Sequence, residues 1–424
     1  MDPKNTKKYR YGIVALLTSG NFINAVDRAS LAVAAPFIIK DFQLDTVSMG
    51  VALSAFFWAY VAFNTPAGNL ADRFGTKRVL GWSAAIWSVF SAITGLAQNL
   101  THIVLARIGV GLGEAASIPC NAKIIASNFP ANERGLAIGT YLSGIRLGNA
   151  ATPILMAFLI QAWGWRSAFI ITGLTSLSWC ILWYFGFKDL SDVKNKAAGS
   201  IEKVKIPWKV ICTNRALFGI TVVKFTQDYL MWMFMTWVPG YLIMGRGFSV
   251  VTMGFYMSMA YAIAGISQPL VGLFSDWLIK RGWSLNRSRK SVLVTLQILA
   301  STIIVTGYAD DVGIAMFFLV LAISAESVCS AVTWTILSDV VPGKLVGSVG
   351  GLINSIGAIG GILAPIVTGV IVKVTGSFQL ALTIGGCGML VAAAFLLFVV
   401  PSLRLLEELD SKAVQPVGTD ISAL

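Results

Sequence analysis

The sequence predicts an all-α membrane protein in which twelve transmembrane helices form two six-helix bundles. Composition is the first observation: 56% of the 424 residues are hydrophobic and 12% are charged, whereas about a quarter of the residues in soluble domains are charged. The mean hydropathy is +0.75. The second observation is that many apolar runs reach the roughly 20 residues with which a helix crosses a bilayer, without the alternation of a β-barrel. The third is a repeat that relates the two halves.

Twelve apolar runs are long enough to be predicted as membrane spans. They cover residues 12–38, 47–68, 79–98, 101–126, 135–161, 165–187, 216–239, 250–274, 291–308, 312–338, 346–371 and 377–401. One long polar segment, from Lys188 to Lys209, follows the sixth run and has the composition of a solvated linker. The predicted parts are a first bundle at 1–187, a cytoplasmic linker at 188–214, a second bundle at 215–403 and a cytoplasmic tail at 404–424.

The 32 lysines and arginines are distributed unevenly between the predicted loops. Segments on the side of both termini hold 24 of them, segments on the opposite side hold 4, and the predicted spans hold 4. This is the positive-inside pattern, which predicts a multi-pass protein of the cell (inner) membrane with both termini in the cytoplasm. It also requires an even number of spans. The net charge of +12 is thereby explained without a nucleic-acid partner.

The two halves carry the same residues at fixed offsets, which indicates an internal duplication. At the ends of the second and eighth spans, Gly68 and Asp72 recur 204 positions later as Gly272 and Asp276. Past this loop the offset becomes 212 and pairs seven further positions. These pairs are Glu114–Glu326, Pro130–Pro342, Gly135–Gly347, Gly139–Gly351, Gly148–Gly360, Pro153–Pro365 and Gly164–Gly376. A shared offset that includes a glutamate inside a span predicts that the bundles are structural copies.

Eight ionisable side chains lie within the predicted spans, where each charge costs roughly 2.5–3.5 kcal/mol or more. They are Asp27, Arg28, Arg107, Glu114, Arg146, Lys224, Asp228 and Glu326. Four carboxylates balance four cations, so protonation of one carboxylate leaves one positive charge uncompensated. This predicts a low-dielectric pocket in which proton uptake and the binding of an organic anion are coupled electrostatically. The titrating side chains are expected to be buried between the two bundles.

Arg107 and Glu114 are seven residues apart and are therefore predicted to lie on one face of the fourth helix. The glycines Gly109, Gly111 and Gly113 between them allow a neighbouring helix to approach closely. An arginine suits a carboxylate ligand because its planar guanidinium binds both oxygens.

Several segments resemble a known transporter superfamily. GNLADRFGTKR at Gly68–Arg78 and its weaker copy GLFSDWLIKR at Gly272–Arg281 resemble the loop signature of the major facilitator superfamily, and RIGVGLGEA at Arg107–Ala115 is similar to its fourth-helix motif. Within it, the segments VDRASLAVA, FFWAY, GLGEAASIPCN and GGLINSIGAIGG resemble the anion:cation symporter family, most closely its bacterial sugar-acid members. The resemblance covers nearly the whole chain.

The resemblance implies the major facilitator fold and import of a small organic anion, such as galactonate, glucarate or a hexuronate, by proton symport. It implies that Arg107 holds the substrate carboxylate and that Asp27 and Glu114 take the protons. Arg28, a further substrate-binding candidate, is implied to exchange ion-pair partners. The loop residues implied to control the conformational change are Gly68, Asp72, Arg73, Gly272 and Asp276. A static salt-bridge network that fixes the first bundle is the structural alternative.

A sugar acid also presents hydroxyl groups, which need polar partners in a largely apolar cavity. Tyr60 and Asn354 match family positions that line the binding site, and Trp334 is a candidate platform for the sugar ring. For the two aromatic residues, packing in the core or at the membrane interface is the alternative. Aromatic and small dicarboxylic acids are alternative substrates. Three further tryptophans suit a ring: Trp58, Trp232 and Trp237.

The chain departs from the sugar-acid pattern at three places. Ile145 followed by Arg146 stands where sugar-acid members carry a glutamine, which indicates either a more acidic or differently shaped anion or a partner for an additional carboxylate. Lys224 and Asp228, four residues apart, are predicted to form an intrahelical pair. Glu326 is either a vestige of the duplication or a second titrating site.

The remaining motifs exclude other function classes. The five cysteines lack CxxC spacing and the single His102 cannot build a zinc site, so no metal is predicted. GVGLGEA lacks the third glycine and the preceding strand of a dinucleotide loop, and no GxxxxGK[ST] motif occurs. We therefore predict a monomeric transporter that is not an enzyme, has no cofactor, and has an organic anion, protons and the lipid bilayer as partners. An anion sensor that does not transport and a facilitator without proton coupling are the alternatives.

Overall fold

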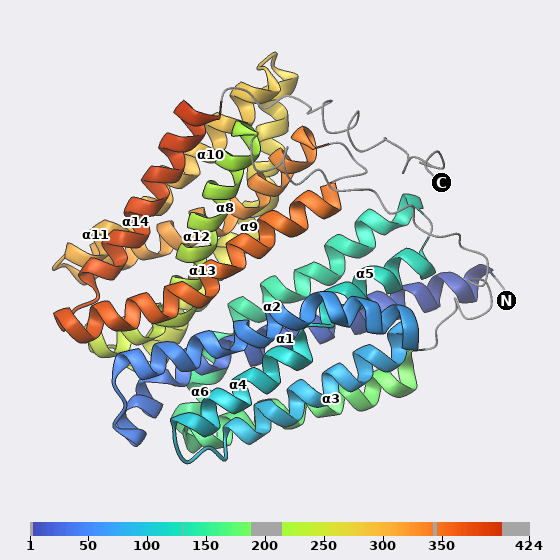
Figure 1. Cartoon of the computed structure of the whole chain (residues 1–424), viewed down its shortest axis with the longest axis horizontal. Coiled ribbons are helices and arrows are strands. Elements are labelled where there is room, and N and C mark those ends of the chain that lie inside the picture. The colour runs from blue at the N-terminus through green and yellow to red at the C-terminus, as the bar shows by residue number, and fades with distance from the viewer. Residues whose placement is uncertain (1–2, 130, 188–213, 342–345, 401–424) are drawn as a thin grey trace, which may run out of the picture.

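Two groups of helices make up the molecule (Figure 1). The computed structural model describes residues 3–129, 131–187, 214–341 and 346–400, and every regular element in them is helical. The first group contains α1 (Pro3–Phe42), α2 (Thr46–Phe74), α3 (Thr76–Thr94), α4 (Leu100–Glu114), α5 (Ser117–Asn128) and α6 (Ala131–Gly186). The second contains α8 (Arg215–Gly240), η2 (Tyr241–Gly245), α9 (Val250–Lys280), α10 (Leu285–Ser301), α11 (Ile303–Tyr308), α12 (Val312–Val340), α13 (Val346–Thr375), α14 (Gln379–Ala394) and η3 (Phe395–Val399).

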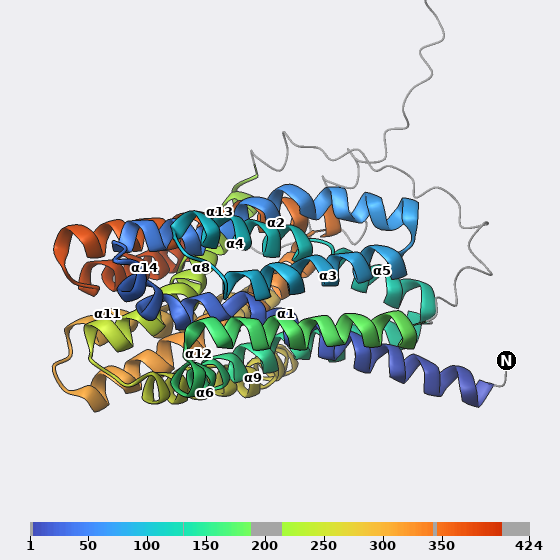
Figure 2. The same cartoon turned by 90° about the horizontal axis from the view of Figure 1, so that it is seen from below.

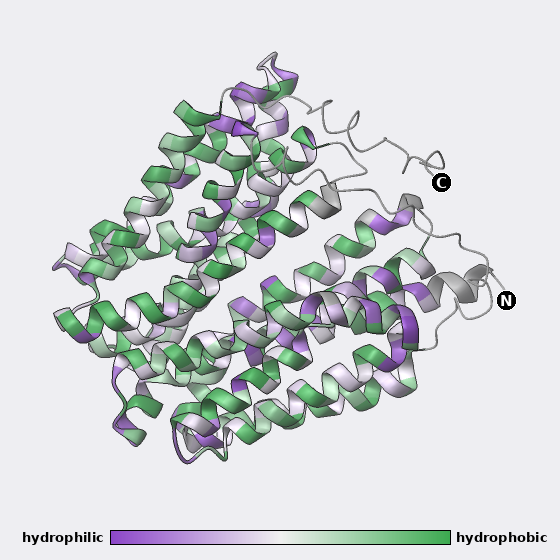
Figure 3. Cartoon of the chain, viewed as in Figure 1, coloured by the Kyte–Doolittle hydropathy of each residue, from purple (hydrophilic) through white to green (hydrophobic). Residues whose placement is uncertain are grey.

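These elements account for the twelve predicted spans. Nine helical stretches of the described chain are long and apolar enough to cross a membrane. One of them, Leu136–Gly186, holds two spans because α6 changes direction at Gly164, and α3 and α8 supply the other two. Hydrophobic residues dominate the length of the helices and hydrophilic ones gather at their ends, with a further hydrophilic group inside the first bundle (Figure 3). The predicted fold class is confirmed.

The predicted boundaries of the linker and the tail are not tested. Residues 188–213 and 401–424 lie outside the described chain. Four of the described helices begin at capping residues of the sequence: the side chains of Asp45, Asn99, Asn214 and Asp311 accept hydrogen bonds from the first-turn amides of α2, α4, α8 and α12.

The fourth span differs from the prediction, because it is two helices, α4 and α5, that are interrupted at Ala115 and Ala116. The carbonyl of Ala115 would bond to the amide of residue 119, but Pro119 has no N–H. The side-chain amide of Asn64 donates to this carbonyl instead, over 3.3 Å. The interruption therefore follows from Pro119 and directly adjoins Glu114.

The duplication is visible in the backbone. Gly164 and Gly376, which are 212 residues apart, both adopt positive φ angles, of 77° and 68°. Each lies at the corner that follows the fifth or the eleventh span, where only glycine is free of strain. Pro153 and Pro365, another repeat pair, both lie inside helices, in α6 and α13.

The two bundles meet through a pair of equivalent glycine contacts. A Cβ added to Gly50 of α2 would lie 2.4 Å from the carbonyl oxygen of Pro365, and one added to Gly254 of α9 would lie 2.8 Å from that of Pro153. Gly50 and Gly254 are themselves 204 residues apart. The α2–α13 and α6–α9 contacts are therefore copies of each other, and both need a glycine for the helices to approach.

The bundles are joined at one end and spread apart at the other. We call the end at which the chain begins the proximal end and the opposite end the distal end. At the distal end Thr46 donates to the carbonyl of Gly369 over 2.7 Å, and Lys373 pairs with Asp45 over 2.6 Å. From there the bundles diverge towards the proximal end (Figure 1). The view from below shows α1 extending past its neighbours towards the N-terminus (Figure 2).

The two copies of the loop motif lie at the proximal end, and their acidic residues pair within their own bundles. Asp72 accepts from Lys123 of α5 over 2.6 Å. Asp276 pairs with Arg289 of α10 over 2.8 Å, and Arg289 also contacts Asp339 over 3.0 Å. Of the other motif residues, Arg73 lies over the ring of Phe74, and Gly68 and Gly272 have room for a side chain.

Gly50 and Gly254 are predicted to be required for the two bundles to pack together at the distal end. Gly50→Ala places a methyl group against the Pro365 carbonyl, and overpacking of this kind costs about 1–3 kcal/mol, so we expect the distal ends to separate in a larger fraction of molecules. Pulsed electron–electron spin distances between labels on α2 and α13 measure that fraction. Gly265→Ala is the matched control, because nothing lies within 4 Å of its added Cβ. An unchanged distance distribution in Gly50→Ala contradicts the interpretation.

The Asp45–Lys373 pair is predicted to be independent of pH in the physiological range. The hydrogen bond from Lys373, followed by that from the Ser48 amide, lowers the pKa of Asp45 from its ordinary value to about 2. A lowered pKa means that the stabilisation is present above the ordinary pKa of an aspartate and is lost as pH falls through about 2. Asp45→Asn should therefore shift the distal distance distribution slightly and equally at pH 5 and pH 8. A shift seen at only one of these values argues against this pair.

Candidate anion-binding site

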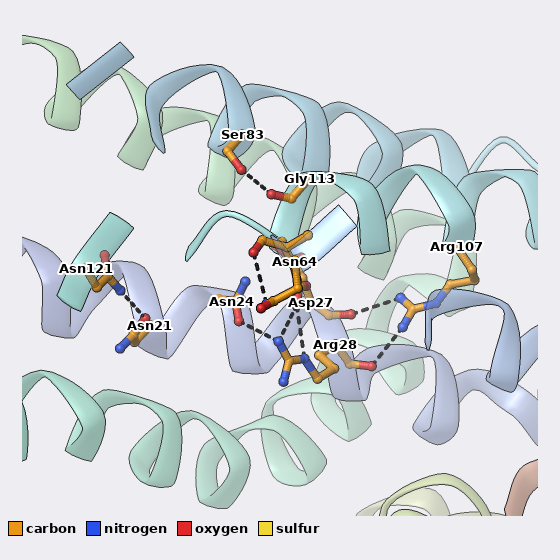
Figure 4. Close-up of polar contacts among 11 residues, drawn as sticks. Asn21, Asn24, Asp27, Arg28, Asn64, Ser83, Arg107, Gly113 and Asn121 are labelled. Carbon is orange, nitrogen blue, oxygen red and sulfur yellow. Dashed lines mark hydrogen bonds and ion pairs between the residues drawn. The ribbon is translucent and has the colours of Figure 1, made fainter. Parts of the chain in front are cut away.

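A stripe of polar side chains runs along α1 where it packs inside the first bundle. Asn21, Asn24 and Arg28 follow each other at spacings of three and four and so share one face of the helix. Asn21 donates to the carbonyl of Tyr141 and accepts from Asn121, both over 3.0 Å. Figure 4 shows this stripe running from Asn21 through Asn24 to Arg28, with Arg107 beyond it. These amides bring polar partners into an otherwise apolar bundle.

Arg28 and Glu114 form an ion pair between α1 and α4. Arg28 donates from Nε and Nη2 to one oxygen of Glu114, over 3.0 and 2.7 Å, and from Nη2 to Asn24 over 3.2 Å. Glu114 is fully buried, and its other oxygen has no hydrogen-bond partner among the described residues. The Arg28 side chain is 18% exposed. Glu114 is therefore the buried member of the pair, and Arg28 is its partly exposed member.

The side chain of Arg107 binds to the backbone of α1. Its two terminal nitrogens donate to the carbonyls of Asp27 and Arg28, over 3.2 and 3.1 Å (Figure 4). It makes no ion pair within the described chain, and its Nε is buried without a partner. Arg107 and Glu114 thus both contact α1, as their spacing predicts. No carboxylate of the described chain therefore neutralises the guanidinium of Arg107.

Aromatic rings lie against the two guanidinium groups, and one of them, Phe56, is near both. The centres of the Arg28 and Arg107 guanidiniums lie 5.0 and 5.4 Å from the centroid of Phe56, and Arg28 lies 5.2 Å from that of Tyr60. Tyr60 stacks on Phe56 at a centroid distance of 5.3 Å. Two like charges are held near each other partly because the negative faces of these rings attract both.

A small pocket lies where these groups meet the second bundle. The first bundle contributes Arg28, Ala32, Leu53, Phe56, Phe57 and Arg107, and the second contributes Trp232, Met235 and Thr236. Phe57 and Trp232 close it across the bundles, with ring centroids 4.4 Å apart. In this structure the pocket has a volume of about 10 Å³, which is too small for a sugar acid. Its two guanidinium groups and aromatic wall, without a carboxylate in the lining, are the groups that would bind an organic anion in a wider state of the interface.

Asp27 does not lie where the sequence analysis expects it. It is fully buried inside the first bundle and accepts hydrogen bonds from Ser91 of α3, over 2.7 Å, and Ser176 of α6, over 2.5 Å. The expectation that it lies between the two bundles is wrong, because neighbouring residues of a helix point about 100° apart and Arg28 takes the inner face. Asp27 is linked to the pocket only through its carbonyl, which binds Arg107.

The predicted pair in the seventh span is confirmed. Lys224 donates to Asp228, and both are buried. A Cβ added to Gly357 of α13 would lie 2.1 Å from a carboxylate oxygen of Asp228, so the pair is covered by α13. It is neutral overall and lies within the second bundle.

The two other departures from the family pattern have no bonded partner. Glu326 of α12 is 1% exposed, and Arg146 of α6 is half-buried. Neither makes a hydrogen bond or an ion pair to any described residue, and Oε1 of Glu326 is buried without a donor.

The predicted hydroxyl-binding residues lie around the pocket rather than in it. Asn354 is exposed and is two helical turns from Gly361, which packs against Phe57, so it faces the first bundle at a more proximal level. Trp334 is 39% exposed and packs on Gly350 of α13. Of the three further tryptophans, Trp232 lines the pocket, Trp237 binds the carbonyl of Pro365, and Trp58 lies at the surface.

The described chain contains no cluster of three or more histidine, cysteine, aspartate or glutamate side chains that could hold a metal ion.

Comparison with known proteins identifies the family of this chain. Residues 17–365 match the model of the Major Facilitator Superfamily. The chain belongs to the major facilitator superfamily.

The superfamily member is similar to transporters over most of its length. It is 33% identical to the probable galactarate/D-glucarate transporter of Escherichia coli (strain K12), covering 94% of this chain and 96% of that protein. It is 32% identical to the probable sulfoacetate transporter of Cupriavidus necator, covering 97% and 98%, and 31% identical to the hexuronate transporter of Bacillus subtilis (strain 168), covering 93% and 96%. The predicted resemblance to sugar-acid transporters is confirmed. These relatives are transporters and not enzymes.

The fold agrees with solved structures of the superfamily. A bacterial homologue of the human lysosomal transporter Spinster superimposes with a TM-score of 0.74, at 19% identity, over 99% of this chain and 100% of that one. At 19% identity, this similarity is evidence for the fold of the chain and not for its substrate.

Several residues of the site were not singled out from the sequence. Ser91 and Ser176 are the partners of Asp27, and Phe56 and Phe57 form the pocket wall. The serines gave no signal, since hydroxyls in spans commonly bond to their own helix. The two phenylalanines belong to the FFWAY segment, whose resemblance to the family also pointed to Tyr60.

Arg107→Lys is predicted to weaken anion binding by about tenfold or more, because a lysine replaces two directed bonds with one point charge. Isothermal calorimetry with an organic anion in detergent measures the change. Arg246→Lys is the matched control, since Arg246 also bonds two carbonyls, those of Thr306 and Ala309, but at the distal end of the second bundle. Both variants should lower the melting temperature, and only Arg107→Lys should lower the affinity. Equal affinity losses in both would show that Arg107 is structural.

Proposed function

We propose that this protein imports an organic anion, a sugar acid of the aldonate, aldarate or hexuronate class, by proton symport with alternating access. The observation that carries the proposal is the Arg28–Glu114 pair at the edge of a pocket that holds a second guanidinium, Arg107. The relatives whose names specify sugar acids support the substrate class. The proposed setting is the cell membrane, with a monomer whose termini are cytoplasmic.

Coupling follows from competition for Arg28. While Glu114 is ionised, it satisfies the Arg28 guanidinium with two hydrogen bonds to one oxygen. A proton on Glu114 removes the charge that holds Arg28, and Arg28 then turns with Arg107 to the anion. Because an uncompensated charge in this low-dielectric site is costly, the anion and the proton favour each other's binding. Asp27, whose side chain is buried inside the first bundle, is proposed as a second proton acceptor. It would act on Arg107 through its own backbone carbonyl, which accepts a hydrogen bond from Arg107.

Alternating access follows from the bundle contacts. In this structure the bundles touch at the distal end, from Gly50 to Phe57, and diverge at the proximal end. The equivalent α2–α13 and α6–α9 contacts close the distal side of the pocket. Rocking of the bundles that parts these contacts and brings the proximal ends together exposes the pocket first to one side of the membrane and then to the other.

An aromatic acid is the second candidate substrate. Phe56, Phe57 and Trp232 line the pocket and offer flat apolar surface beside the two guanidinium groups. Such a wall stacks on a benzoate-type ring as well as on the apolar face of a sugar.

Uptake into proteoliposomes tests the proposal. Purified protein should accumulate labelled D-glucarate or D-glucuronate when the outside is acidified, and acidification should leave protein-free vesicles unaffected. Glu114→Gln is expected to abolish pH-driven accumulation while exchange of internal for external anion continues, because a neutral side chain cannot release a proton. Glu133→Gln, whose glutamate is in a part-exposed pair with Arg10, is the control.

Each alternative has a distinct outcome. Accumulation of a benzoate but of no sugar acid selects the aromatic substrate class. Uptake that does not respond to the pH gradient and is unchanged in Glu114→Gln identifies an uncoupled facilitator. Binding without any uptake identifies a sensor.

A further inference from the structure

The ion pair between Arg28 and Glu114 has a third member, Asn24, which has no role in the proposed function. Asn24 lies one helical turn before Arg28 on α1 and is 4% exposed. Its side-chain oxygen accepts a hydrogen bond from Nη2 of Arg28 over 3.2 Å, and the same nitrogen donates to Oε2 of Glu114 over 2.7 Å. One guanidinium nitrogen therefore bridges an amide oxygen and a carboxylate oxygen.

Two complementary atoms beside this bridge have no hydrogen-bond partner. Nδ2 of Asn24, a donor, and Oε1 of Glu114, an acceptor, are both buried and make no bond of normal length to any described residue. The two side chains are nevertheless close enough to interact directly. Unpaired buried donors and acceptors are rare because each is costly. These two atoms therefore indicate a second arrangement of the amide and the carboxyl group, in which they pair.

Protonation of Glu114 requires such an arrangement. In the proposed function the proton releases Arg28 to the anion, and the carboxyl group loses the two hydrogen bonds that Arg28 supplies. It also gains an O–H donor that needs an acceptor. Because Glu114 is fully buried, these bonds must come from neighbouring side chains rather than from bulk water.

The ionisable groups on the helices packed around Glu114 are bound elsewhere. Arg107 of α4 donates to two carbonyls of α1, and the carboxyl of Asp27 on α1 accepts from α3 and α6. Tyr60 of α2 lies over the guanidinium of the ion pair, and α3 carries charge only in its first turn. Asn24 is the described side chain that already contacts the pair and still has a free donor.

We propose that Asn24 is a positioning residue that binds Glu114 when Glu114 is protonated, so that a proton replaces the guanidinium between the same two oxygens. This rests on the proposed function. In the ionised state Nη2 of Arg28 bridges Oδ1 of Asn24 and Oε2 of Glu114. In the protonated state the O–H group at Oε2 donates to Oδ1, and Nδ2 donates to Oε1. A carboxylic acid and a primary amide are complementary because each offers a donor and an acceptor.

This exchange releases Arg28 without leaving an unpaired group behind. Asn24 and Glu114 lose the same guanidinium nitrogen together and then satisfy each other. In the ionised state Glu114 already has two hydrogen bonds from Arg28, so Asn24 stabilises the protonated state more than the ionised one. The amide thereby sets the pH at which Glu114 takes up its proton and at which the anion binds.

Asn24→Leu is predicted to move the pH dependence of transport to lower pH. Leucine has nearly the size of asparagine but neither donates nor accepts, so the proton on Glu114 is left without an acceptor. In proteoliposomes, the external pH of half-maximal D-glucarate uptake should fall by about one unit or more.

Asn21→Leu is the matched control. Asn21 lies one turn earlier on the same face of α1, is equally buried, and bonds to Tyr141 and Asn121 but not to the ion pair. Both variants should lower the melting temperature, because both remove a buried hydrogen-bonded amide. Only Asn24→Leu should shift the pH dependence.

Difference infrared spectroscopy measures the same contact without transport. The C=O stretch of protonated Glu114 is the band that Glu114→Gln lacks. It should move to higher frequency in Asn24→Leu, where the carboxyl group loses its hydrogen bonds to the amide, and should stay in place in Asn21→Leu.

Asn24→Asp tests the proposal if Asn24→Leu does not fold. A carboxylate of the same shape holds Arg28 even when Glu114 is protonated. D-glucarate uptake at neutral pH should therefore fall by about tenfold or more.

The outcomes separate this inference from the proposed function. An unchanged pH dependence and an unchanged carboxyl band in Asn24→Leu, equal shifts in Asn24→Leu and Asn21→Leu, or wild-type uptake by Asn24→Asp overturns the role of Asn24 and leaves proton symport standing. D-glucarate uptake by the wild type that does not respond to pH overturns both.

Discussion

The structure depends on the ion pair between Arg28 and Glu114. A charge inside a membrane is costly unless it has a partner, and this pair lets α1 and α4 pack through the interior of the first bundle, with Glu114 buried and Arg28 at the pocket. The surrounding architecture serves that contact: Gly111 and Gly113 bring α4 against α2 and α3, and Pro119 interrupts the helix directly after Glu114. In the proposed mechanism, a proton on Glu114 frees Arg28 from this bond so that it can bind the anion.

The bundle interface decides where this chemistry takes place. Its two equivalent contacts each pair a glycine with a proline carbonyl, Gly50 with Pro365 and Gly254 with Pro153. Both lie distal to the pocket, so the two guanidiniums occupy the boundary between closed and separated parts of the interface. Because the contacts are copies produced by duplication, the two bundles meet through matching contacts on this side of the pocket.

The sequence was sufficient for the fold and for the charged residues around the pocket, and insufficient for the aromatic and hydroxyl groups beside them and for the orientation of the side chains. Hydropathy and charge gave the twelve spans, and the fixed offsets gave the repeat that reappears at Gly164 and Gly376. The Lys224–Asp228 pair followed from its spacing. The position of Asp27 did not, because the face that a charged residue takes depends on its partners in other helices, and Ser91 and Ser176 are 64 and 149 residues away. Pro119 was a readable signal for the break in the fourth span.

The central claim is that protonation of a buried carboxyl and anion binding at the arginines are one equilibrium. The most direct measurement is the proton release or uptake that accompanies binding, followed with a pH indicator when D-glucarate is added to purified protein in weakly buffered detergent. The account predicts that the protein takes up protons as the anion binds and that Glu114→Gln takes up fewer. Binding of the anion with no proton uptake by the wild-type protein would contradict it.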